Sequence, residues 1–350
     1  MRSLSDMTLP ELEEALEARG AEKWRARPIL LWLHRRGAVS YDGMTDQSLE
    51  LRAELSRELP LTRTAVLEHR TAPDGTAKFL VGLDDGDAVE AVLIPEDDRR
   101  TVCVSTQVGC PVGCVFCASG LGGLKRGLSA GEIVEQVLHA RRALGPEGRI
   151  TSVVVMGVGE PLLNFENVVK ALRIMKASWG MGIGYNRITL STVGILGPLA
   201  ALVERKVTPN LAISLHAPND AIRREVVPSL SSVRLADLIR AGLGYRRATG
   251  KNVTFEYVLL DGVNDDRRHA LELGKKLRGE KVKVNVIPYN RVEGLPYRAP
   301  PPERVDRFVE ALGRCGVPVT VRKRKGDEVS AACGQLRARR GAKEEGCLTS

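Results

Sequence analysis

The sequence predicts an α/β protein whose larger part is made of parallel βα units. From residue 101 onward, β-branched apolar runs alternate with helix-like stretches, a pattern typical of parallel strands buried on both faces. Before that point, residues 1–60 carry helix signals and residues 61–99 change to an apolar period of two. With 350 residues, of which 43% are apolar, the chain can bury a full hydrophobic core, so global disorder is excluded.

Three helices are predicted within residues 1–60. The first can begin at Ser5 or Thr8, which are N-cap residue types, and it ends at Gly20, a residue type common just after the last helical turn. An apolar stretch that ends at Gly37 predicts the second helix, and the third runs to the end of this region.

Residues 61–99 predict a small antiparallel sheet. Apolar and polar residues alternate there in short runs, and Asp74-Gly75 and Asp85-Gly86 separate the runs. An Asp-Gly pair between alternating runs is a typical hairpin turn.

Six parallel strands are predicted in the rest of the chain, with a seventh after a further helix near residues 302–314. Six βα units suit an incomplete barrel, and a doubly wound sheet fits the same periodicity. The six candidate strands are residues 101–106, 151–156, 187–191, 211–215, 253–259 and 282–287, and the seventh is 317–322.

The composition makes nucleic acid a candidate partner. Lysine and arginine number 52 against 43 aspartate and glutamate, a net charge of +9, and a basic tail follows the last predicted strand. Aromatic residues make up only 4% of the chain, which argues against a base-stacking platform of many exposed rings.

We expect a cytoplasmic protein without a membrane span. No apolar run reaches the roughly 18 residues that cross a bilayer, and Met1 is followed by acidic, helix-like sequence instead of a basic and then apolar leader. In a reducing compartment, clustered cysteines are metal ligands or catalytic thiols rather than disulfides.

Cys110, Cys114 and Cys117 follow the first parallel strand in a glycine-containing loop. Thiols at this spacing can converge on one iron–sulfur cluster, and three thiolate ligands on a four-iron cluster leave one iron open for a substrate or cofactor. A zinc site with Cys103 as the fourth ligand is the alternative, but zinc sites usually use paired Cys-x₂-Cys hooks. The Cys-x₃-Cys-x₂-Cys spacing, with Phe116 before the last cysteine, favours the cluster.

The cysteine spacing and four further stretches resemble the RlmN/Cfr family of radical S-adenosylmethionine (SAM) RNA methyltransferases. The stretches are residues 89–97 (VEAVLIPED), 103–110 (CVSTQVGC), 156–164 (MGVGEPLLN) and 331–336 (AACGQL), and the resemblance covers essentially the whole chain. It implies a partial (βα)6 radical-SAM barrel. The expected domains are a helical RNA-binding accessory domain at 1–60, a small antiparallel β segment at 61–99, the barrel at 100–300 and a C-terminal extension at 301–350.

The resemblance implies methyl transfer to C2 of adenine, both in 23S rRNA at the peptidyl transferase centre and in tRNA just 3′ of the anticodon. Residues 123–126 depart from the Phe-Asn-Arg text common in RlmN members, so a Cfr-like C8-methyltransferase is the alternative enzyme. A zinc-stabilised RNA-binding module without catalysis is the alternative of another class.

The resemblance also implies one 4Fe-4S cluster on the three cysteines and two SAM molecules per turnover. One SAM methylates Cys333, and the other generates a 5′-deoxyadenosyl radical that removes hydrogen from the methylated cysteine. Cys103 is then the resolving thiol, which forms a transient disulfide with Cys333 as the product leaves. Without the resemblance, a buried structural thiol is the simpler interpretation of Cys333.

Glu90 matches the position of the proton acceptor in this family. It lies on a predicted strand with Ala88, Val92 and Ile94 on its own face, an unusual place for a carboxylate, and partial desolvation there would raise its pKa. A salt-bridged glutamate at the edge of the sheet is the alternative. Either Glu90 or a cysteine removes the C2 proton in this scheme.

The residues that follow the predicted strands form the expected SAM site, because barrel enzymes place their sites at the carboxyl ends of the strands. Taken alone, His216 would be a satisfied core histidine, but its neighbours place it at this site. The expected SAM-binding residues are Gly159, Glu160, Ser191, Ser214, Leu215, His216 and Asn290.

The expected partners are 23S rRNA, tRNA and a reducing electron donor such as flavodoxin. Basic residues within 322–325 and 337–340 flank Cys333, and we expect them to bind RNA phosphates together with Lys125, Arg126 and the N-terminal domain. The target adenine has to leave its stack to reach the site. The sequence holds no recognisable dimer motif, so we expect a monomer.

Overall fold

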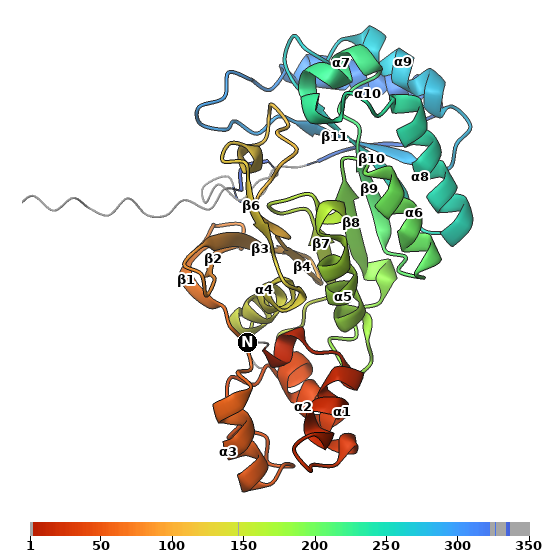
Figure 1. Ribbon diagram of the computed structural model, residues 1–350. Coiled ribbons are helices and arrows are strands. Elements are labelled where there is room, and N and C mark those ends of the chain that lie inside the picture. The colour runs from red at the N-terminus through yellow and green to blue at the C-terminus, as the bar shows by residue number, and fades with distance from the viewer. Residues whose placement is uncertain (1–2, 146, 323–325, 327–333, 337–350) are drawn as a thin grey trace, which may run out of the picture.

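The computed structural model describes residues 3–145, 147–322, 326 and 334–336. An N-terminal group of helices, a curved sheet and a set of helices on the outside of that sheet make up the molecule (Figure 1). The α/β class predicted from the sequence is confirmed.

The N-terminal helices form a small body at one end of the molecule (Figure 1). A capping box begins the first helix, because the Thr8 N–H donates to Glu11 Oε2 at 2.7 Å, and Gly37 ends the second in the left-handed conformation. The elements are 3₁₀ turns at Leu4–Asp6 and Lys23–Arg25, α1 (Leu9–Glu17), α2 (Ala26–Leu31), a π turn (Trp32–Arg36) and α3 (Leu49–Glu58).

A buried carboxylate joins this N-terminal body to the rest of the protein. Glu135, on α4 (Ala130–Ala143), accepts hydrogen bonds from the Thr64 N–H at 2.7 Å, from the Arg63 N–H at 3.0 Å and from the Ser5 hydroxyl. The segment that leaves the helical body is therefore fixed to the first barrel helix through one side chain.

Three antiparallel strands follow, as predicted, with turns at Gly75 and Gly86 in the left-handed conformation. They are β1 (Ala65–Thr71), β2 (Ala77–Gly82) and β3 (Ala88–Glu96). We expected a sheet of their own, but β3 also pairs antiparallel with β4 (Arg99–Cys103), so these strands continue the main sheet. The pairing covers the edge of β4, which would otherwise be an open row of hydrogen-bonding groups.

The parallel strands lie side by side in the order in which they occur along the chain. Chain order excludes the doubly wound alternative, because a doubly wound sheet reverses its strand order at a switch point. Among the described strands β1 and β12 are the two edges, so the barrel is open. The parallel strands are β4, β7 (Ser152–Val155), β8 (Ile188–Thr192), β9 (Asn210–Ser214), β10 (Val253–Leu259), β11 (Lys283–Pro288) and β12 (Val319–Val321).

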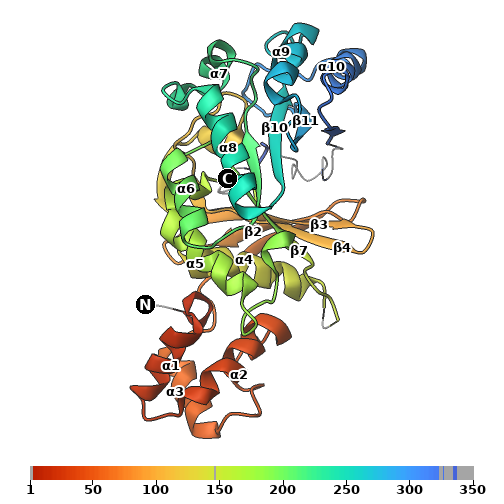
Figure 2. The ribbon, with the colours of Figure 1, turned by 90° about the vertical axis from the view of Figure 1, so that its right-hand side faces the viewer.

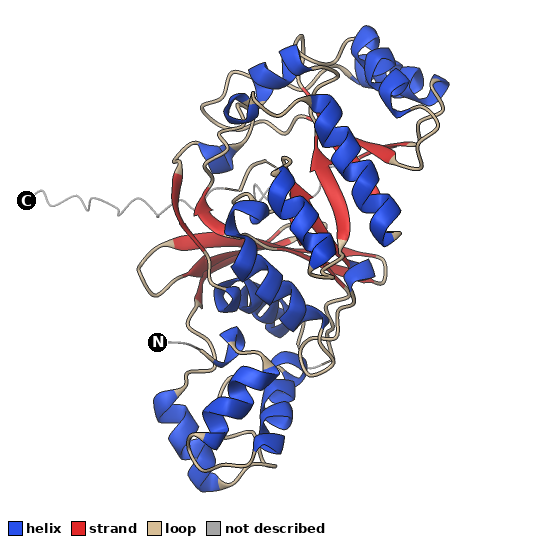
Figure 3. Ribbon diagram, turned by 45° about the vertical axis from the view of Figure 1, so that its right-hand side comes forward, coloured by secondary structure: helices blue, strands red, loops and turns tan. Residues whose placement is uncertain are grey.

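Helices cover the outer face of the sheet, as the secondary-structure colours in Figure 3 show. Figure 2 shows the twist of the sheet. In this view β2, β3 and β4 lie roughly horizontally, whereas β10 and β11 lie roughly vertically. The helices that connect the strands are α4, α5 (Phe165–Lys176), α6 (Leu196–Glu204), α7 (Asp220–Val226), α8 (Leu235–Thr249), α9 (Arg267–Leu277) and α10 (Pro302–Arg314). Among the described residues, none of these helices combines the length and the apolar character that a membrane span requires.

A second, two-stranded sheet was missed by the sequence analysis. It consists of β5 (Gln107–Gly109) and β6 (Leu124–Gly127), which pair antiparallel on either side of the cysteine loop. Gly109 has a φ of +78°, and a Cβ atom there would lie 1.9 Å from the Gly123 carbonyl oxygen, so only glycine fits. The two strands therefore close the cysteine loop at its base.

Candidate active site

The three cysteines of the motif lie on one loop between β5 and β6. The Cys110 N–H donates to Gly123 O at 3.0 Å, and the Cys117 N–H donates to Cys114 O at 3.1 Å, so the loop folds back on itself. Burial raises the pKa of Cys110 to about 11 and that of Cys114 well above its usual range, and the neighbouring thiols raise both further. The loop bonds thus hold the three cysteines on one short loop, and their side chains are near enough to interact electrostatically.

This arrangement fits an iron–sulfur cluster and contradicts the zinc alternative. Cys103 packs with Val92 and Val158, whereas the three motif cysteines pack against a different hydrophobic cluster. Three cysteines on one loop can hold a four-iron cluster, whereas zinc needs a fourth ligand, and Cys103 packs in a different cluster from the other three.

Four of the expected SAM residues line one cavity beside Cys117. Ser191, Ser214, His216 and Asn290 all come from the carboxyl ends of neighbouring parallel strands. The empty space of the cavity, counted together with the solvent at its mouth, is about 620 Å³. Because parallel strands end at the same edge of the sheet, residues far apart in the chain meet there.

His216 has a fixed tautomer in this cavity. Its Nδ1 accepts a hydrogen bond from the Val258 N–H at 3.1 Å, and burial lowers its pKa to about 3. The neutral ring therefore carries its proton on Nε2 and offers a donor. The backbone of His216 is left-handed, with a φ of +57°, and the ring meets Phe116 edge to face at 4.8 Å. A non-glycine residue in this conformation is typical of functional sites.

Two other expected SAM residues, Gly159 and Glu160, lie in the loop after β7. Among the described residues around this cavity neither lines its wall. Glu160 accepts from the Thr192 hydroxyl at 2.7 Å, from the Val193 N–H at 2.8 Å and from the Leu162 N–H at 3.0 Å, and burial raises its pKa. The carboxylate thus ties the loop after β7 to the end of β8.

Leu215, the remaining expected residue, is fully buried in the hydrophobic core. Its carbonyl oxygen accepts a hydrogen bond from Arg223 Nη1 at 2.6 Å. Among the described residues, the Leu215 side chain is not part of the cavity wall.

Glu256 is a cavity residue that the sequence analysis did not identify. It lies on β10 directly opposite Ser214 of β9 and Asn285 of β11, and Asn285 Nδ2 donates to its Oε2 at 2.7 Å. Burial raises the pKa of Glu256, and the positive charge of Arg322 opposes this rise. A glutamate inside the otherwise apolar run 253–259 was the signal that could have found it. Met156, Val258, Ile287, Tyr289, Arg322 and Gly334 also line the cavity.

Glu90 and Cys103 lie on the same face of the sheet. Val92 pairs with Cys103 across β3 and β4, and Glu90 is two residues before Val92, so all three side chains point to one side. Glu90 is buried and forms an ion pair with Lys78, so the alternative of a salt-bridged glutamate describes its contact correctly. It is not at an edge, because β3 lies between β2 and β4.

Cys333 lies outside the described residues, and so do the basic residues at 323–325 and 337–340. The short described segment 334–336 lies against the cysteine loop. The Ala118 N–H donates to Gly334 O at 2.8 Å, and the Ser119 hydroxyl donates to Leu336 O at 2.9 Å. Leu336 packs with Cys103. Gly334 lines the cavity beside Cys117 that contains the expected SAM residues, called the SAM-type cavity below.

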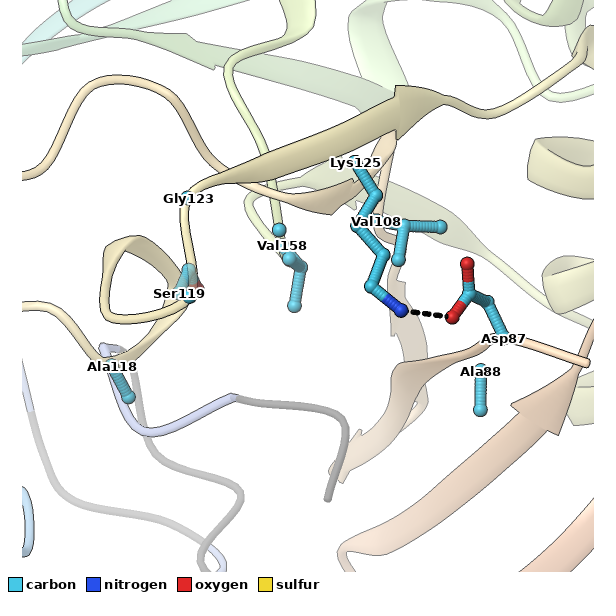
Figure 4. A pocket seen from close by; sticks show the side chains of 10 residues that line it. Asp87, Ala88, Val108, Ala118, Ser119, Gly123, Lys125 and Val158 are labelled. Carbon is cyan, nitrogen blue, oxygen red and sulfur yellow. Dashed lines mark hydrogen bonds and ion pairs between the residues drawn. The ribbon is translucent and has the colours of Figure 1, made fainter. Parts of the chain in front are cut away.

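A second pocket lies on the other side of the cysteine loop (Figure 4). Ala118 and Ser119 line it from the cysteine loop, Val158 from the segment after β7, Lys125 from β6 and Asp87 from the turn between β2 and β3. Lys125 Nζ lies 2.5 Å from Asp87 Oδ1, the contact that Figure 4 marks with a dashed line. Its neighbour Arg126 pairs with Glu132 at 2.8 Å and with Asp85, so both cations expected to bind RNA already have acidic partners.

Comparison with known proteins supports one family. The family model for the ribosomal RNA large subunit methyltransferase N-terminal domain matches residues 2–60, and the radical SAM superfamily model matches residues 104–274. The chain is 45% identical over 338 residues to a probable dual-specificity RNA methyltransferase RlmN of Rhodopirellula baltica, covering 97% of this chain and 91% of that one. It is 44% identical to the dual-specificity RNA methyltransferase RlmN of Syntrophobacter fumaroxidans, covering 97% and 98%.

A solved structure matches over nearly the whole chain. The crystal structure of a radical SAM methyltransferase from Sphaerobacter thermophilus superimposes with a TM-score of 0.94 and 46% sequence identity, covering 97% of this chain and all of that one. The open barrel, the cysteine loop and the family matches agree with one another. The chain belongs to the RlmN family of dual-specificity RNA methyltransferases, enzymes of the radical SAM superfamily.

Proposed function

We propose that this RNA methyltransferase transfers a methyl group to C2 of adenine in 23S rRNA and in the tRNA position just 3′ of the anticodon, through a methylated Cys333. The observation that carries the proposal is the position of segment 334–336. This segment lies between the SAM-type cavity and Cys103, and it follows Cys333 directly in the chain.

The cofactor assignment follows from the donor sets. Cys110, Cys114 and Cys117 would hold a 4Fe-4S cluster, because thiolates are the ligands of such clusters and the loop brings three of them together. The cavity beside Cys117 would hold SAM, with His216 Nε2 and the serine hydroxyls as donors. When bound, the cluster supplies the electron that cleaves SAM into methionine and a 5′-deoxyadenosyl radical.

Two SAM molecules are used in each turnover in this proposal, one as methyl donor to Cys333 and one as radical source. Carbon 2 of adenine carries no acidic proton, so a polar methyl transfer has no nucleophile to use. Glu90 is proposed as the proton acceptor, and its ion pair with Lys78 favours the carboxylate form that this role requires. Cys103 is proposed as the thiol that releases the product, since it lies on the same face as Glu90 and contacts Leu336.

The choice of C2 over C8 rests on the whole-chain similarity. Relatives named RlmN match at 44–45% identity over 97% of this chain, including the N-terminal domain. The departure at residues 123–126 lies at the second pocket and not at the SAM-type cavity, because Gly123 and Lys125 line the former. The C8 product therefore remains the alternative outcome of the experiment below.

We propose that each domain has the role that is expected from the sequence. Residues 1–60 would bind RNA, 61–99 would carry Glu90, 100–300 would carry the cofactors and 301–350 the methyl-carrying cysteine. Lys125 and Arg126 would contribute to RNA binding only by exchanging their acidic partners for phosphates. We further propose a cytoplasmic monomer that receives electrons from a donor such as flavodoxin.

The test is anaerobic incubation of the full chain with SAM, dithionite and rRNA or tRNA that lacks the modification, followed by mass spectrometry of the nucleosides. We expect 2-methyladenosine. A product of 8-methyladenosine would move the protein to the C8 branch. SAM cleavage without either product would leave the radical chemistry standing and overturn the substrate assignment.

Two cysteine variants separate catalytic roles from structural ones. Cys333→Ala is expected to abolish methylation while the iron content stays at the wild-type level. Cys315→Ala is the matched control, because Cys315 is a buried thiol packed against α9 at Gly274, away from the cysteine loop. Full methylation by Cys333→Ala would refute the methyl-carrier role. A colourless protein with stoichiometric zinc after anaerobic purification would refute the cluster.

A further inference from the structure

Arg223 is a fully buried arginine beside the cysteine loop, and neither the motifs nor the family match accounts for it. It lies on α7, and only 1% of the residue is exposed. Arginine is rarely buried to this degree without an acidic partner, because a charge removed from water needs compensation. The groups around the Arg223 guanidinium therefore indicate the role of its positive charge.

Backbone carbonyls orient the guanidinium. Nη1 donates to Ser214 O at 2.9 Å and to Leu215 O at 2.6 Å, and Nη2 donates to Val193 O at 2.7 Å. These carbonyls belong to the carboxyl ends of β8 and β9, so the side chain also ties two strand ends together. The carbonyls carry no net charge, so they position the cation without cancelling it. The Nε–H has no hydrogen-bond partner in the described part of the chain.

The cysteine loop is bonded to the segment that carries Arg223. The Val115 N–H donates to Val226 O at 3.2 Å, and the Ser229 hydroxyl donates to Val112 O at 2.5 Å. The motif cysteines pack against the hydrophobic cluster that contains Val226. These bonds fix the loop to α7 and to the turn that follows it.

The charge of Arg223 acts on a motif thiol. The charge of Arg223 interacts with Cys114, and hydrogen bonds to the carbonyls of Val193, Ser214 and Leu215 hold the guanidinium in that place. Glu160 is a buried carboxylate whose negative charge also acts on Cys110 and Cys114. Its oxygens accept hydrogen bonds from the Thr192 hydroxyl and from the Val193 and Leu162 N–H groups. Asp220, on the same helix, is an acidic group whose charge also acts on Arg223. Arg223 is therefore a buried cation held beside the cysteine loop.

We propose that Arg223 sets the reduction potential of the cluster by stabilising its reduced form. The proposal depends on the placement of the cluster on Cys110, Cys114 and Cys117 proposed above. Reduction adds one electron, and hence one unit of negative charge, to the cluster with its three thiolates, while no bond or proton changes at Arg223. A fixed cation in a region of low dielectric lowers the free energy of the more negative form, which raises the potential. Arg223 is thus a positioning residue that does not touch the substrate.

The test is a redox titration of the anaerobically reconstituted full chain with dithionite as the reductant, followed by electron paramagnetic resonance. Arg223→Met removes the charge and keeps an unbranched side chain, and Arg223→Lys keeps the charge. Arg224→Met is the matched control, because Arg224 is the next residue on α7, is exposed, and loses the same formal charge. Iron and sulfide are measured in each variant before the titration.

We expect the midpoint potential of Arg223→Met to shift to more negative values by more than the repeat error, while Arg224→Met keeps the wild-type potential. Arg223→Lys should lie between the two. A full cluster with an unchanged potential in Arg223→Met would overturn the proposal.

Failure of a variant to hold the cluster is also informative. Loss of the cluster in Arg223→Met with retention in Arg223→Lys would support a requirement for the charge. Loss in both variants would show that the side chain only holds the strand ends, and would overturn the proposal. A wild-type chain that takes up no cluster would instead contradict the proposed function, so the two failures are distinguishable.

Discussion

Lys78 Nζ lies 2.9 Å from Glu90 Oε1, and both side chains are mostly buried on the adjacent strands β2 and β3. Removing one partner of such a pair leaves an uncompensated charge in a place with little water. The same contact holds Glu90 as a carboxylate on the face of the sheet that carries Cys103. An ion pair and a role as proton acceptor are therefore compatible in this residue.

Replacing Glu90 by Gln is expected to lower methylation about 100-fold or more, the usual contribution of a general base. The iron content should not change, because Glu90 is on a different strand from the cysteine loop. Nucleoside mass spectrometry and iron analysis check both statements. Glu68→Gln is the control, since Glu68 forms an exposed ion pair with Arg70 on β1. Wild-type methylation by Glu90→Gln would remove Glu90 from the mechanism.

Gly159→Ala is expected to destabilise the protein by about 1–3 kcal/mol, the usual size of a strained backbone position, and to weaken SAM binding. Gly159 has a φ of +110°, and a Cβ atom there would lie 2.7 Å from Gln107 Cβ. A shift would also break the bond from the Glu160 N–H to Gln107 Oε1, now 2.8 Å. Thermal unfolding and SAM binding measure the two effects.

Gly244→Ala is the matched control for that substitution. Gly244 lies on α8, and a Cβ atom there would meet nothing within 4 Å. The change should leave SAM binding intact and stabilise the helix by up to about 1 kcal/mol. A similar loss of stability in both variants would show that the steric argument for Gly159 is wrong.

Glu135→Gln is expected to loosen the N-terminal helical body from the barrel. The Thr64 and Arg63 N–H groups both donate to Glu135 Oε2, whereas the Ser3 and Ser5 hydroxyls donate to Oε1. A glutamine that keeps its oxygen on the two backbone groups turns its NH₂ donors towards the serine hydroxyls, which then lose their acceptor. Leaving buried groups unsatisfied costs about 1–3 kcal/mol each. Limited proteolysis should then cut the chain near residues 61–64 faster than in wild type, and an unchanged digestion pattern would contradict this.

His34 makes the stability of the protein depend on pH. The side chain is buried, both ring nitrogens lack a hydrogen-bond partner among the described residues, and burial lowers its pKa to about 3. Below pH 6.5 the unfolded chain binds a proton at this histidine, whereas the folded chain does not bind one until the pH nears 3. The free energy of unfolding therefore falls as the pH drops from about 6.5 towards 3, by up to about 1.4 kcal/mol per pH unit.

His34→Leu removes this dependence and the two unsatisfied nitrogens. We expect a gain of about 1 kcal/mol at pH 7 and a smaller loss of stability between pH 6.5 and 5.5. Anaerobic urea unfolding at the two pH values, followed by tryptophan fluorescence, checks both expectations. An unchanged pH slope would show that His34 is protonated in the folded protein.

Several elements were predictable because their signals are local. The observed ends of the seven parallel strands differ from the predicted ends by at most three residues, since a buried strand needs a continuous apolar run. Thr8 and Gly37 act at helix ends as expected for their residue types. The cysteine spacing, together with residues that follow strands, identified four residues that do share one cavity.

Other features were not predictable because they join distant parts of the chain. The pairing of β3 with β4, which merges the antiparallel strands into the main sheet, leaves no trace in the periodicity of either segment. Lys125 and Arg126 looked like free cations, but their acidic partners at 85, 87 and 132 are visible only in three dimensions.

The sequence by itself determined the α/β class, the succession of strands and helices along the chain, the cluster-type cysteine motif and the family, because each depends on residue types at fixed spacing along the chain. Only the tertiary structure decided that the barrel stays open in chain order, that Glu160 holds strand ends while Glu256 faces the cavity, and that Arg223 lies beside the cysteine loop. These outcomes depend on burial and on contacts between remote residues, and such contacts form only when the strands have paired.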